Sequence, residues 1–273
     1  MAKTYVPGVP CWVDLASPDP GRAAAFYGTV FGWQIEDRSS DGDGTYRWAR
    51  LDGVDVAGIA GTGVGPATWR TFVRVDDADR AATDAVAQGG AAVEQDLTVP
   101  PDGRAVMLTD PAGAEVGVWA PSTHPGAQLV NAPGTWNFNT LRTPDLDAAE
   151  TFYGAVLGWR VAAADFGGFT ATMLCRPGYG DVVDADNPGW KKRHEEGGSP
   201  AGFTDIVAWL EKAPAPARWG VEFNVHDTRA TVDAAVSLGG QVLRAPTEGF
   251  GMWSAALVDP LGAEFSINDF GSA

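Results

Sequence analysis

Apolar and polar residues follow two different periods along this chain, and the two periods alternate in a fixed order. Residues 11–16, CWVDLA, form an apolar stretch of strand length, and residues 20–31 then place their apolar side chains at helical spacing on one face. Asp19 can cap this helix, Pro20 suits its first turn, and Gly32 ends it. The chain is therefore predicted to open with a strand that leads through a short turn into a helix.

Short strands follow this helix and are separated by glycine-rich turns. They are predicted over residues 34–38, 45–53 and 55–61. The order then restarts with a strand at 70–75, a helix opened by Asp76 or Asp77 and closed by Gly89 and Gly90, and strands at 91–95, 104–110 and 115–120. The pattern up to this point predicts two consecutive βαβββ modules.

The same pattern returns further along the chain as an internal repeat. Residues 14–33 and 140–159 are identical at ten of twenty positions, at an offset of 126 without a gap. Residues 75–90 match 225–240 at an offset of 150, and DPAGAE at 110–115 matches DPLGAE at 259–264 at an offset of 149. Three colinear matches indicate a duplication. The offset grows by 24, so the second copy carries an insertion between residues 160 and 220.

The repeat predicts an α+β protein of four βαβββ modules arranged as two domains. The first domain is expected over residues 1–121, and the second over 135–273. A stretch rich in Pro, Gly and Ala at 122–134 is the expected linker, and the insertion is expected at about 177–200.

Composition and net charge indicate which classes of molecule this protein is expected to bind. The 273 residues are 45% hydrophobic and 20% charged, which is typical of a globular protein, and neither a membrane span nor a signal peptide is visible. A formal charge of −16 disfavours nucleic acids and anionic membranes. Cys11 and Cys175 are expected to be small buried hydrophobes in a reduced cytoplasm. We therefore expect a cytoplasmic monomer or homodimer whose partner is a small molecule.

The repeated motifs resemble those of a known superfamily. In each half a strand is followed by S/T-P-D and a helix that ends in FYG-x-V-[FL]-GW, and DP-x-GAE precedes the final strand. This pattern resembles the vicinal-oxygen-chelate superfamily of glyoxalases, bleomycin-resistance proteins and extradiol dioxygenases, and within it the tandem actinobacterial members often labelled glyoxalase-like or hydroxylase. The resemblance implies a tandem vicinal-oxygen-chelate fold, in which curved mixed sheets form cup-like cavities. In the metal-using members, His, Gln or Glu ligands project into the cup from the first and last strands of a module.

Those ligand positions can be assigned in this chain by spacing, and none of them holds a usual metal ligand. They are Trp12, Gly58, Arg70, Gly117, Phe138, Ala208, Gly220 and Ser266, of which Gly58 and Ala208 come from weaker pattern matching. The apolar alternation supports this choice of face, because Val13 and Leu15 fall on the opposite, helix-packed face. The three histidines, His124, His194 and His226, are too scattered to join one cup. We expect no metal and no cofactor.

The residues that strand alternation places on the cup face suggest a pocket for a small molecule instead. The candidates for ligand binding are Trp12, Phe72, Phe138, Thr140, Asn224 and Ser266. An apolar wall with a few polar groups is the usual composition of such a pocket. Trp12 and Phe138 either offer aromatic faces to a flat ligand or fill the space of a lost metal.

Two carboxylates on the cup face are candidates for acid–base chemistry. A buried Glu222 would have a raised pKa, which suits a general acid or base. Alternatively, Glu222 is an exposed or ion-paired residue with Arg218 as its partner. The same two interpretations apply to Asp14. Asn139, on the helix-packed face, needs hydrogen-bond partners and is expected to be structural.

The insertion is the main difference between the two halves. Its segment WKKRHEE predicts one or two helical turns between Pro- and Gly-containing stretches. It is either a solvated loop or interface arm, or a lid over the second cup that uses Tyr179, Asp181 or Trp190. Because this segment occurs in the second half alone, residues of that half are expected to dominate the ligand site.

Three functions remain open at this point. The first is metal-independent binding of a hydrophobic or aromatic metabolite, for sequestration or resistance. The second is a metal-independent isomerase, cyclase or lyase of secondary metabolism that uses Glu222 or Asp14. The third is a metal-dependent glyoxalase or dioxygenase with displaced ligands.

Overall fold

The computed structural model describes residues 3–37, 46–99, 101–249 and 251–269. Its first half contains β1 (Pro10–Ser17), α1 (Pro20–Phe31), β2 (Gln34–Asp37), β3 (Tyr46–Leu51), β4 (Val54–Gly61), β5 (Thr68–Arg74), α2 (Ala78–Ala87), β6 (Ala91–Val99), β7 (Gly103–Thr109) and β8 (Glu115–Pro121). This is the predicted βαβββ order, twice. Asp19 caps α1, and Asp77 rather than Asp76 caps α2.

The second half repeats the order and adds the insertion. It contains β9 (Trp136–Thr143), α3 (Leu146–Leu157), β10 (Arg160–Asp165), β11 (Thr170–Cys175), α4 (Tyr179–Asp186), α5 (Trp190–Glu196), a 3-10 turn (Phe203–Asp205), β12 (Ile206–Lys212), β13 (Arg218–Asn224), α6 (Thr228–Ser237), β14 (Gln241–Gly249), β15 (Met252–Val258) and β16 (Glu264–Asp269). The predicted turns of WKKRHEE are α5, while α4 was not predicted.

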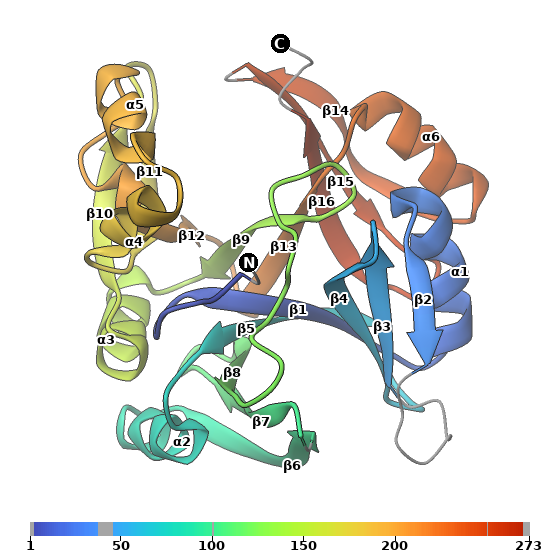
Figure 1. Cartoon of the computed structure of the whole chain (residues 1–273), viewed down its shortest axis with the longest axis horizontal. Helices are drawn as coiled ribbons and strands as arrows, with labels where there is room; N and C mark the ends of the chain where they lie inside the picture. The colour runs from blue at the N-terminus through green and yellow to red at the C-terminus, as the bar shows by residue number, and fades with distance from the viewer. Residues whose placement is uncertain (1–2, 38–45, 100, 250, 270–273) are drawn as a thin grey trace.

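Each half forms one curved, mixed, eight-stranded sheet, as Figure 1 shows. The strand orders are β2-β3-β4-β1-β5-β8-β7-β6 and β10-β11-β12-β9-β13-β16-β15-β14. In each sheet the first strands of the two modules pair antiparallel, β1 with β5 and β9 with β13. Both modules of a half therefore share one sheet, which confirms the tandem vicinal-oxygen-chelate fold and gives each half its own cup.

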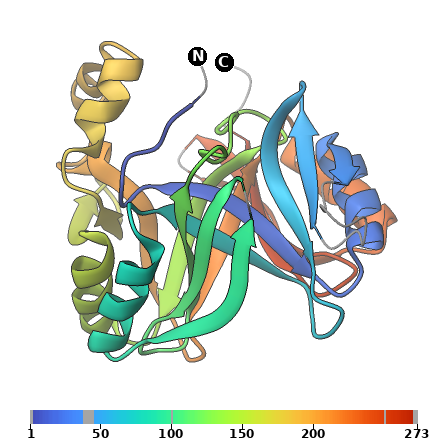
Figure 2. The same cartoon turned by 60° about the horizontal axis from the view of Figure 1, so that its bottom comes forward.

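The two halves pack against each other through their helix-covered faces. Figure 2 shows α2 beside α3 on one side of the molecule and α1 beside α6 on the other. One core contains rings from both halves, with Phe31 at 4.7 Å from Phe223 between ring centres. The other core joins α2 to α3. Asn139 is buried at this junction and accepts a hydrogen bond from Thr71 at 2.9 Å, as its expected structural role requires.

The repeated FYG and DP-x-G motifs meet across the junction. The hydroxyl of Tyr27 donates to Asp259 at 3.0 Å and accepts from the indole of Trp69 at 3.0 Å. Tyr153 makes the equivalent bond to Asp110 at 3.0 Å. Both tyrosines are fully buried. Each half thus supplies the tyrosine that satisfies the carboxylate of the other half.

A second pair of contacts crosses the junction in the same reciprocal way. The indole of Trp33 donates to the carbonyl of Gly134, and that of Trp159 donates to the carbonyl of Gly8, both at 2.6 Å. Each glycine has a positive φ, and a Cβ on it would stand within 2.8 Å of a carbonyl oxygen from the other half. Glycine is therefore required for this close approach.

The linker runs back over the first cup before it enters the second half. Ala127 donates through its backbone to Cys11, and Gln128 donates to Asp55. Residue Ala127 is buried among the rings of the first core. In the part of the chain that the structure describes, no helix has the length and apolar character needed to cross a membrane.

Candidate ligand-binding site

The first cup is nearly filled by its own aromatic side chains. Its walls include Trp12, Tyr46, Trp48, Phe72 and Trp119. The ring of the linker residue His124 lies among them, at 4.7 Å from Trp12 and 4.2 Å from Trp48 between ring centres. The remaining cavity has a volume of about 90 Å³, which is smaller than the ~150 Å³ cavity known to admit benzene in another protein.

Four side chains of the first cup, those of Trp12, Asp14, Tyr46 and Arg70, are joined by hydrogen bonds. Arg70 donates two hydrogen bonds to Asp14, of 2.6 and 2.8 Å, and both residues line the cavity. The Tyr46 hydroxyl accepts from the Trp12 indole at 2.9 Å and donates to Asp14 at 3.4 Å. Burial, followed by the nearby Asp14 charge, raises the pKa of Tyr46 well above its usual value. Asp14 is thus held as the partner of Arg70, which opposes a role as a free general base.

The floor of the second cup is polar and carries Glu222. Thr140 donates to one carboxylate oxygen at 2.8 Å, and the Asn268 amide donates to the other at 3.5 Å. Asn137 donates in turn to Asn268 at 3.0 Å. Asn224 lies on the same face, since it is the parallel partner of Asn268. The cluster joins neighbouring strands β9, β13 and β16 at the centre of the sheet.

Glu222 lies in the second cup and is not paired with Arg218. Arg218 lies near Glu264, at 3.7 Å, so the alternative of a Glu222–Arg218 pair is wrong. Burial raises the pKa of Glu222, while the Thr140 hydrogen bond and the Arg142 charge oppose the shift. The side chain is half-buried. It combines limited contact with water and a raised pKa, as a general acid or base requires.

An aromatic wall stands beside this polar floor. The rings of Phe138 and Trp209 lie 5.7 Å apart between centres. Trp209 is the partner of Thr140 in the parallel β9–β12 pair, so it faces the cup. The assignment of Ala208 to the cup face was wrong by one residue, because Ala208 is fully buried in the core on the helix side.

The residues at the former ligand positions do not fit a divalent metal. In the first cup the cup-facing set is Trp12, Gly58, Arg70 and Gly117, and in the second it is Phe138, Trp209, Gly220 and Ser266. Divalent metals in such sites need imidazole, carboxylate or thiolate groups that converge on one point. Within the described ranges, no three His, Cys, Asp or Glu side chains converge in this way.

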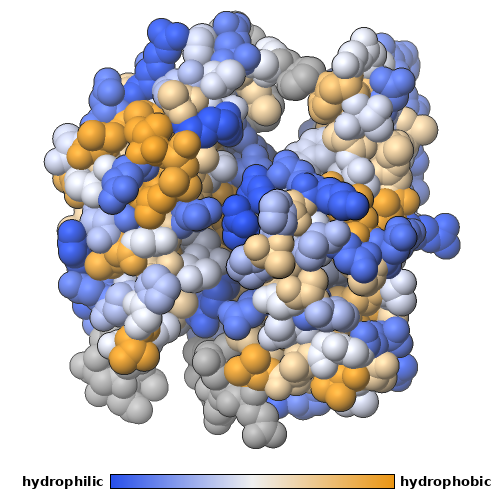
Figure 3. All heavy atoms as spheres, turned by 180° about the vertical axis from the view of Figure 1, so that it is seen from behind, coloured by the Kyte–Doolittle hydropathy of each residue, from blue (hydrophilic) through white to orange (hydrophobic). Residues whose placement is uncertain are grey.

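The two cups differ in access as well as in chemistry. Four cup-facing positions are equivalent in the two halves. In the first half they are all buried and are Trp12, Gly58, Phe72 and Gly117. In the second half they are all half-buried and are Phe138, Trp209, Glu222 and Ser266. Figure 3 shows an open hollow between the lobe of α4 and α5 and the lobe of α6 and β14. The second cup is therefore the more accessible of the two.

The insertion is connected to the aromatic wall by a row of rings. Trp190 lies 4.5 Å from His194, His194 lies 5.5 Å from Phe203, and Phe203 lies 6.4 Å from Trp209, all between ring centres. Helices α4 and α5 stand beside β10 and β11 at this edge of the sheet (Figure 1). The insertion thus reaches the aromatic wall through Phe203, and Trp190 lies at the far end of this row of rings.

The other two insertion candidates point elsewhere. Tyr179 packs against the core between α2 and α3. Asp181 is exposed and forms an ion pair with Lys191 at 2.7 Å, which links α4 to α5. Both residues stabilise the insertion, and the structure does not bring them to the polar floor.

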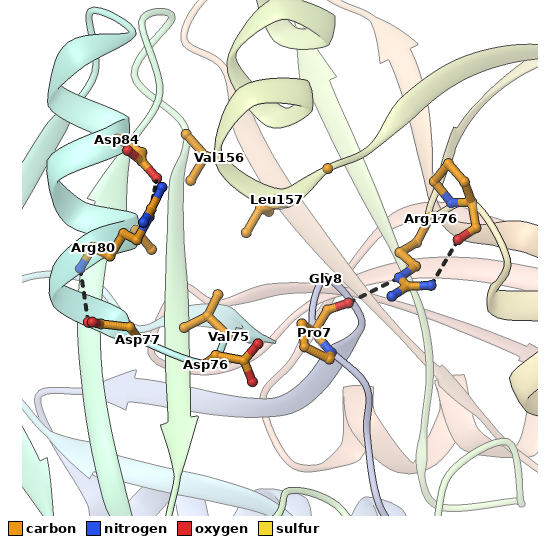
Figure 4. A pocket seen from close by; sticks show the side chains of 13 residues that line it. Pro7, Gly8, Val75, Asp76, Asp77, Arg80, Asp84, Val156, Leu157 and Arg176 are labelled. Atoms are coloured by element: carbon orange, nitrogen blue, oxygen red, sulfur yellow. Dashed lines mark hydrogen bonds and ion pairs between the residues drawn. The ribbon is translucent and has the colours of Figure 1, made fainter.

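A separate groove lies outside both cups, between α2 and the end of α3 (Figure 4). Its volume is about 490 Å³. Its charged residues are already engaged, since Arg80 lies 3.6 Å from Asp84 and Arg176 donates to the carbonyl of Pro7 at 3.1 Å. The groove follows the junction of the halves and shows no convergent polar group.

Several site residues were not predicted. Trp209 lies in the uninterrupted apolar run IVAWL, which gives no alternation from which to choose a face. Asn137 reaches the cup because the β9–β13 pairing shifts between Phe138 and Trp136. Tyr46 and Trp48 could have been found by placing the period-two alternation of β3 on the same sheet as β1.

Comparisons with known proteins agree with this architecture. A family model described as a glyoxalase-like domain matches residues 12–119 and again 139–268. A protein named "Putative glyoxylase CFP32" from Mycobacterium tuberculosis is 34% identical over 271 residues, which cover 96% of this chain and 95% of the relative. The "Anthracycline biosynthesis protein DnrV" of Streptomyces peucetius is 33% identical over 279 residues, with 96% and 94% covered.

Solved structures with the same fold include a Mn(II)-bound glyoxalase and a 2,3-dioxygenase. The Mn(II)-bound glyoxalase from Novosphingobium aromaticivorans superposes with a TM-score of 0.61 at 14% identity, covering 97% of this chain and 82% of that one. The 2,3-dioxygenase LapB from Pseudomonas sp. KL28 gives 0.63 at 15% identity, covering 98% and 94%. At these identities the likeness is one of fold. With both halves matched by the family model and with relatives aligned over nearly their whole length, this chain belongs to the glyoxalase-like family of the vicinal-oxygen-chelate fold.

Proposed function

We propose that this protein binds a small, flat and largely apolar molecule in the second cup, without a metal ion. The observation that carries the proposal is the arrangement on one accessible concave surface of an aromatic wall, Phe138 and Trp209, and a carboxylate, Glu222, that is held by Thr140. Ligand pockets are typically apolar with a few placed polar groups. A relative named for anthracycline biosynthesis supports trials with fused aromatic rings.

The first cup serves as scaffolding in this proposal. Its cavity of about 90 Å³ is too small for a fused ring system, and its carboxylate is already bound to Arg70. The linker covers the cup and pairs with both β1 and the residue Asp55 of β4. Binding by the second half alone would explain why the aromatic rings of the first cup are buried.

Titration calorimetry with a panel of fused aromatic compounds, in buffer containing EDTA, tests the proposal. Phe138→Leu and removal of residues 180–199 should weaken binding, while Trp12→Phe, which changes the first cup, should leave it unchanged. Loss of binding in Trp12→Phe together with full binding by the other two variants would place the site in the first half. Circular dichroism of each variant would show that the fold is retained.

A second candidate function is metal-independent catalysis with Glu222 as general acid or base. The raised pKa of this carboxyl favours it. Mass spectrometry of compounds that bind would detect conversion. An enzyme should lose turnover in Glu222→Gln while retaining ligand affinity, whereas a binding protein should show no product with either form.

A further inference from the structure

A buried ion pair lies on the floor of the first cup. Asp14 of β1 and Arg70 of β5 are directly opposite each other in their antiparallel pair, and two hydrogen bonds join their side chains. The exposed fraction of the side chain is 3% for Asp14 and 11% for Arg70. A guanidinium and a carboxylate therefore meet at the centre of this sheet in the two-bonded geometry that suits both groups.

The repeat places two uncharged residues at the equivalent positions of the second cup. Thr140 stands at the position of Asp14. Gly220 stands at the position of Arg70 and pairs with Thr140 between β9 and β13. Val221, the next residue, is buried in the core between the halves, so Gly220 lies on the opposite, cup-facing side of the strand. The second cup therefore has neither member of this ion pair.

A different arginine supplies a guanidinium to the floor of the second cup. Arg142 follows Thr140 by two residues on β9, and it lies over Gly220, where a Cβ would be 2.7 Å from the terminal nitrogen Nη1. A side chain at position 220 would displace this guanidinium. The group also lies close enough to the Glu222 carboxyl to act on it as a positive charge. Both cups thus hold a guanidinium at this place, although it comes from different strands.

The carboxylate that faces this group in the first cup has no equivalent in the second. Among the residues that the structure describes, the guanidinium of Arg142 makes one hydrogen bond, from Nε to Glu211 at 2.9 Å, and no ion pair joins it to Glu222. A guanidinium has five N–H donors. The Arg142 side chain is 29% exposed. Its two terminal nitrogens therefore remain available to a ligand in the cup.

A second guanidinium faces the same cup. Regular pairing across β14, β15, β16 and β13 connects Arg244 to Glu222, and directly paired residues point to the same side of a sheet. Arg244 donates to the hydroxyl of Ser254 at 3.0 Å and forms no ion pair within the described ranges. Burial raises the pKa of Glu222, so its carboxyl repels an anion less than an exposed carboxylate would. The charges on this face are therefore compatible with an anionic group.

We propose that the ligand of the second cup carries a carboxylate, which the terminal nitrogens of Arg142 bind above Gly220, as a carboxylate of the protein itself is bound in the first cup. This inference rests on the proposed function, because it assumes that the second cup is the binding site. The aromatic part of the ligand packs against Phe138 and Trp209. The class of ligand is thus an aromatic carboxylic acid, bound as its anion.

Three naphthalene derivatives of similar size test the inference by calorimetry with the full chain in EDTA at about pH 7. Naphthalene-2-carboxylate should bind at least ~10-fold more tightly than naphthalene-2-carboxamide, which has a similar shape and no charge. It should also bind more tightly than 2-naphthylmethylammonium, although the net charge of −16 favours the cation at long range. Equal affinity for the acid and the amide, or a preference for the amide or the cation, would overturn the inference and leave the proposed function in place. If neither these probes nor other fused aromatics bind at all, the proposed function fails together with the inference.

Substitution of Arg142 tests which guanidinium is responsible. Arg142→Gln should reduce the preference for the acid over the amide to less than about 2-fold. Arg218→Gln is the matched control, because Arg218 is directly opposite Arg142 on the same face and forms an ion pair with Glu264. This control removes the same charge and should keep the preference. A full preference in Arg142→Gln, or an equal loss in Arg218→Gln, would overturn the inference.

Gly220→Ala moves the guanidinium without changing any charge. The backbone at Gly220 is not in the left-handed region, so alanine fits it, while the new Cβ forces the end of the Arg142 side chain aside. The preference for the acid over the amide should fall by at least about 3-fold, and circular dichroism should show an unchanged fold. An undiminished preference in this folded variant would mean that the carboxylate is not bound above Gly220, and would overturn the inference.

Discussion

The hydroxyl of Tyr27 in the first half donates to the carboxylate of Asp259 in the second at 3.0 Å, and no water-accessible surface remains on the tyrosine. Tyr27→Phe would leave both this carboxylate and the Trp69 indole without the hydroxyl. An unsatisfied buried partner costs about 1–3 kcal/mol. Urea unfolding should show a loss of this size. Because Tyr153 has the same environment, Tyr153→Phe should cost a similar amount.

Tyr179→Phe is the control for these two substitutions. The Tyr179 hydroxyl forms no hydrogen bond among the described residues, so its removal should change the free energy of unfolding by less than about 0.5 kcal/mol. Losses as small as this in Tyr27→Phe and Tyr153→Phe would contradict the importance of the reciprocal bonds.

The stability effect of Glu222 should depend on pH. Its pKa in the folded protein is raised above the ordinary 4.5 because the carboxyl is buried. Below the ordinary value the group is protonated in both states and has no effect; as the pH rises through the folded-state pKa, ionisation inside the cup lowers the free energy of unfolding. Glu222→Gln should therefore raise the melting temperature at about pH 7 and not at about pH 4.

Removal of an exposed carboxylate serves as the comparison for this experiment. Glu150→Gln changes the net charge by the same amount on the exposed face of α3. A gain of equal size in both variants would mean that reduced overall repulsion, rather than relief of burial, is responsible.

The two junction glycines should resist substitution. A Cβ at Gly8 would stand 2.7 Å from the carbonyl oxygen of Leu157, and one at Gly134 would stand 2.8 Å from that of Phe31. Gly53 has a similar φ, with no atom within 4 Å of such a Cβ. In Gly53→Ala the measured loss reflects φ alone, about 1 kcal/mol. Gly8→Ala and Gly134→Ala should lose clearly more in urea unfolding, and a loss equal to that of Gly53→Ala would contradict the close approach.

Chelators should leave the melting temperature unchanged. A metal bound to the folded state would stabilise it by mass action, so its removal would lower the melting temperature by several degrees. Among the residues whose placement is described, the cup-facing side chains offer no set of ligands that would produce this effect. A drop on addition of EDTA that is reversed by Zn²⁺, Fe²⁺ or Ni²⁺ would show that metal ligands have been overlooked.

The fold could be predicted because its signals are local and are repeated. The helix caps Asp19 and Asp145, the FYG motif and the alternation of each strand recur at fixed offsets, so one half supports the interpretation of the other. In β1, β5, β9 and β13 the alternation of apolar residues shows which residues face the helices and which face the cup. Trp12, Phe138 and Glu222 were placed on the cup side for that reason.

Other parts of the site depend on contacts that periodicity does not encode. The face of Trp209 was missed because an insertion and an irregular β11–β12 pairing separate it from the repeat pattern. His124 reaches the first cup through the path of the linker, which tertiary packing decides. The Tyr27 hydroxyl donates to Asp259, which is 232 residues away in the sequence, and no local pattern predicts such a pair.

The reciprocal junction also bears on how the two cups could come to differ. Two separate copies of one such half could satisfy each other's tyrosine and tryptophan bonds, as the halves do here. In such a homodimer a single gene would specify both cups, and every substitution would appear in both. Joining the copies in one chain removes that constraint. Ancestral symmetry is then preserved where the halves depend on each other, and each cup is free to acquire its own chemistry.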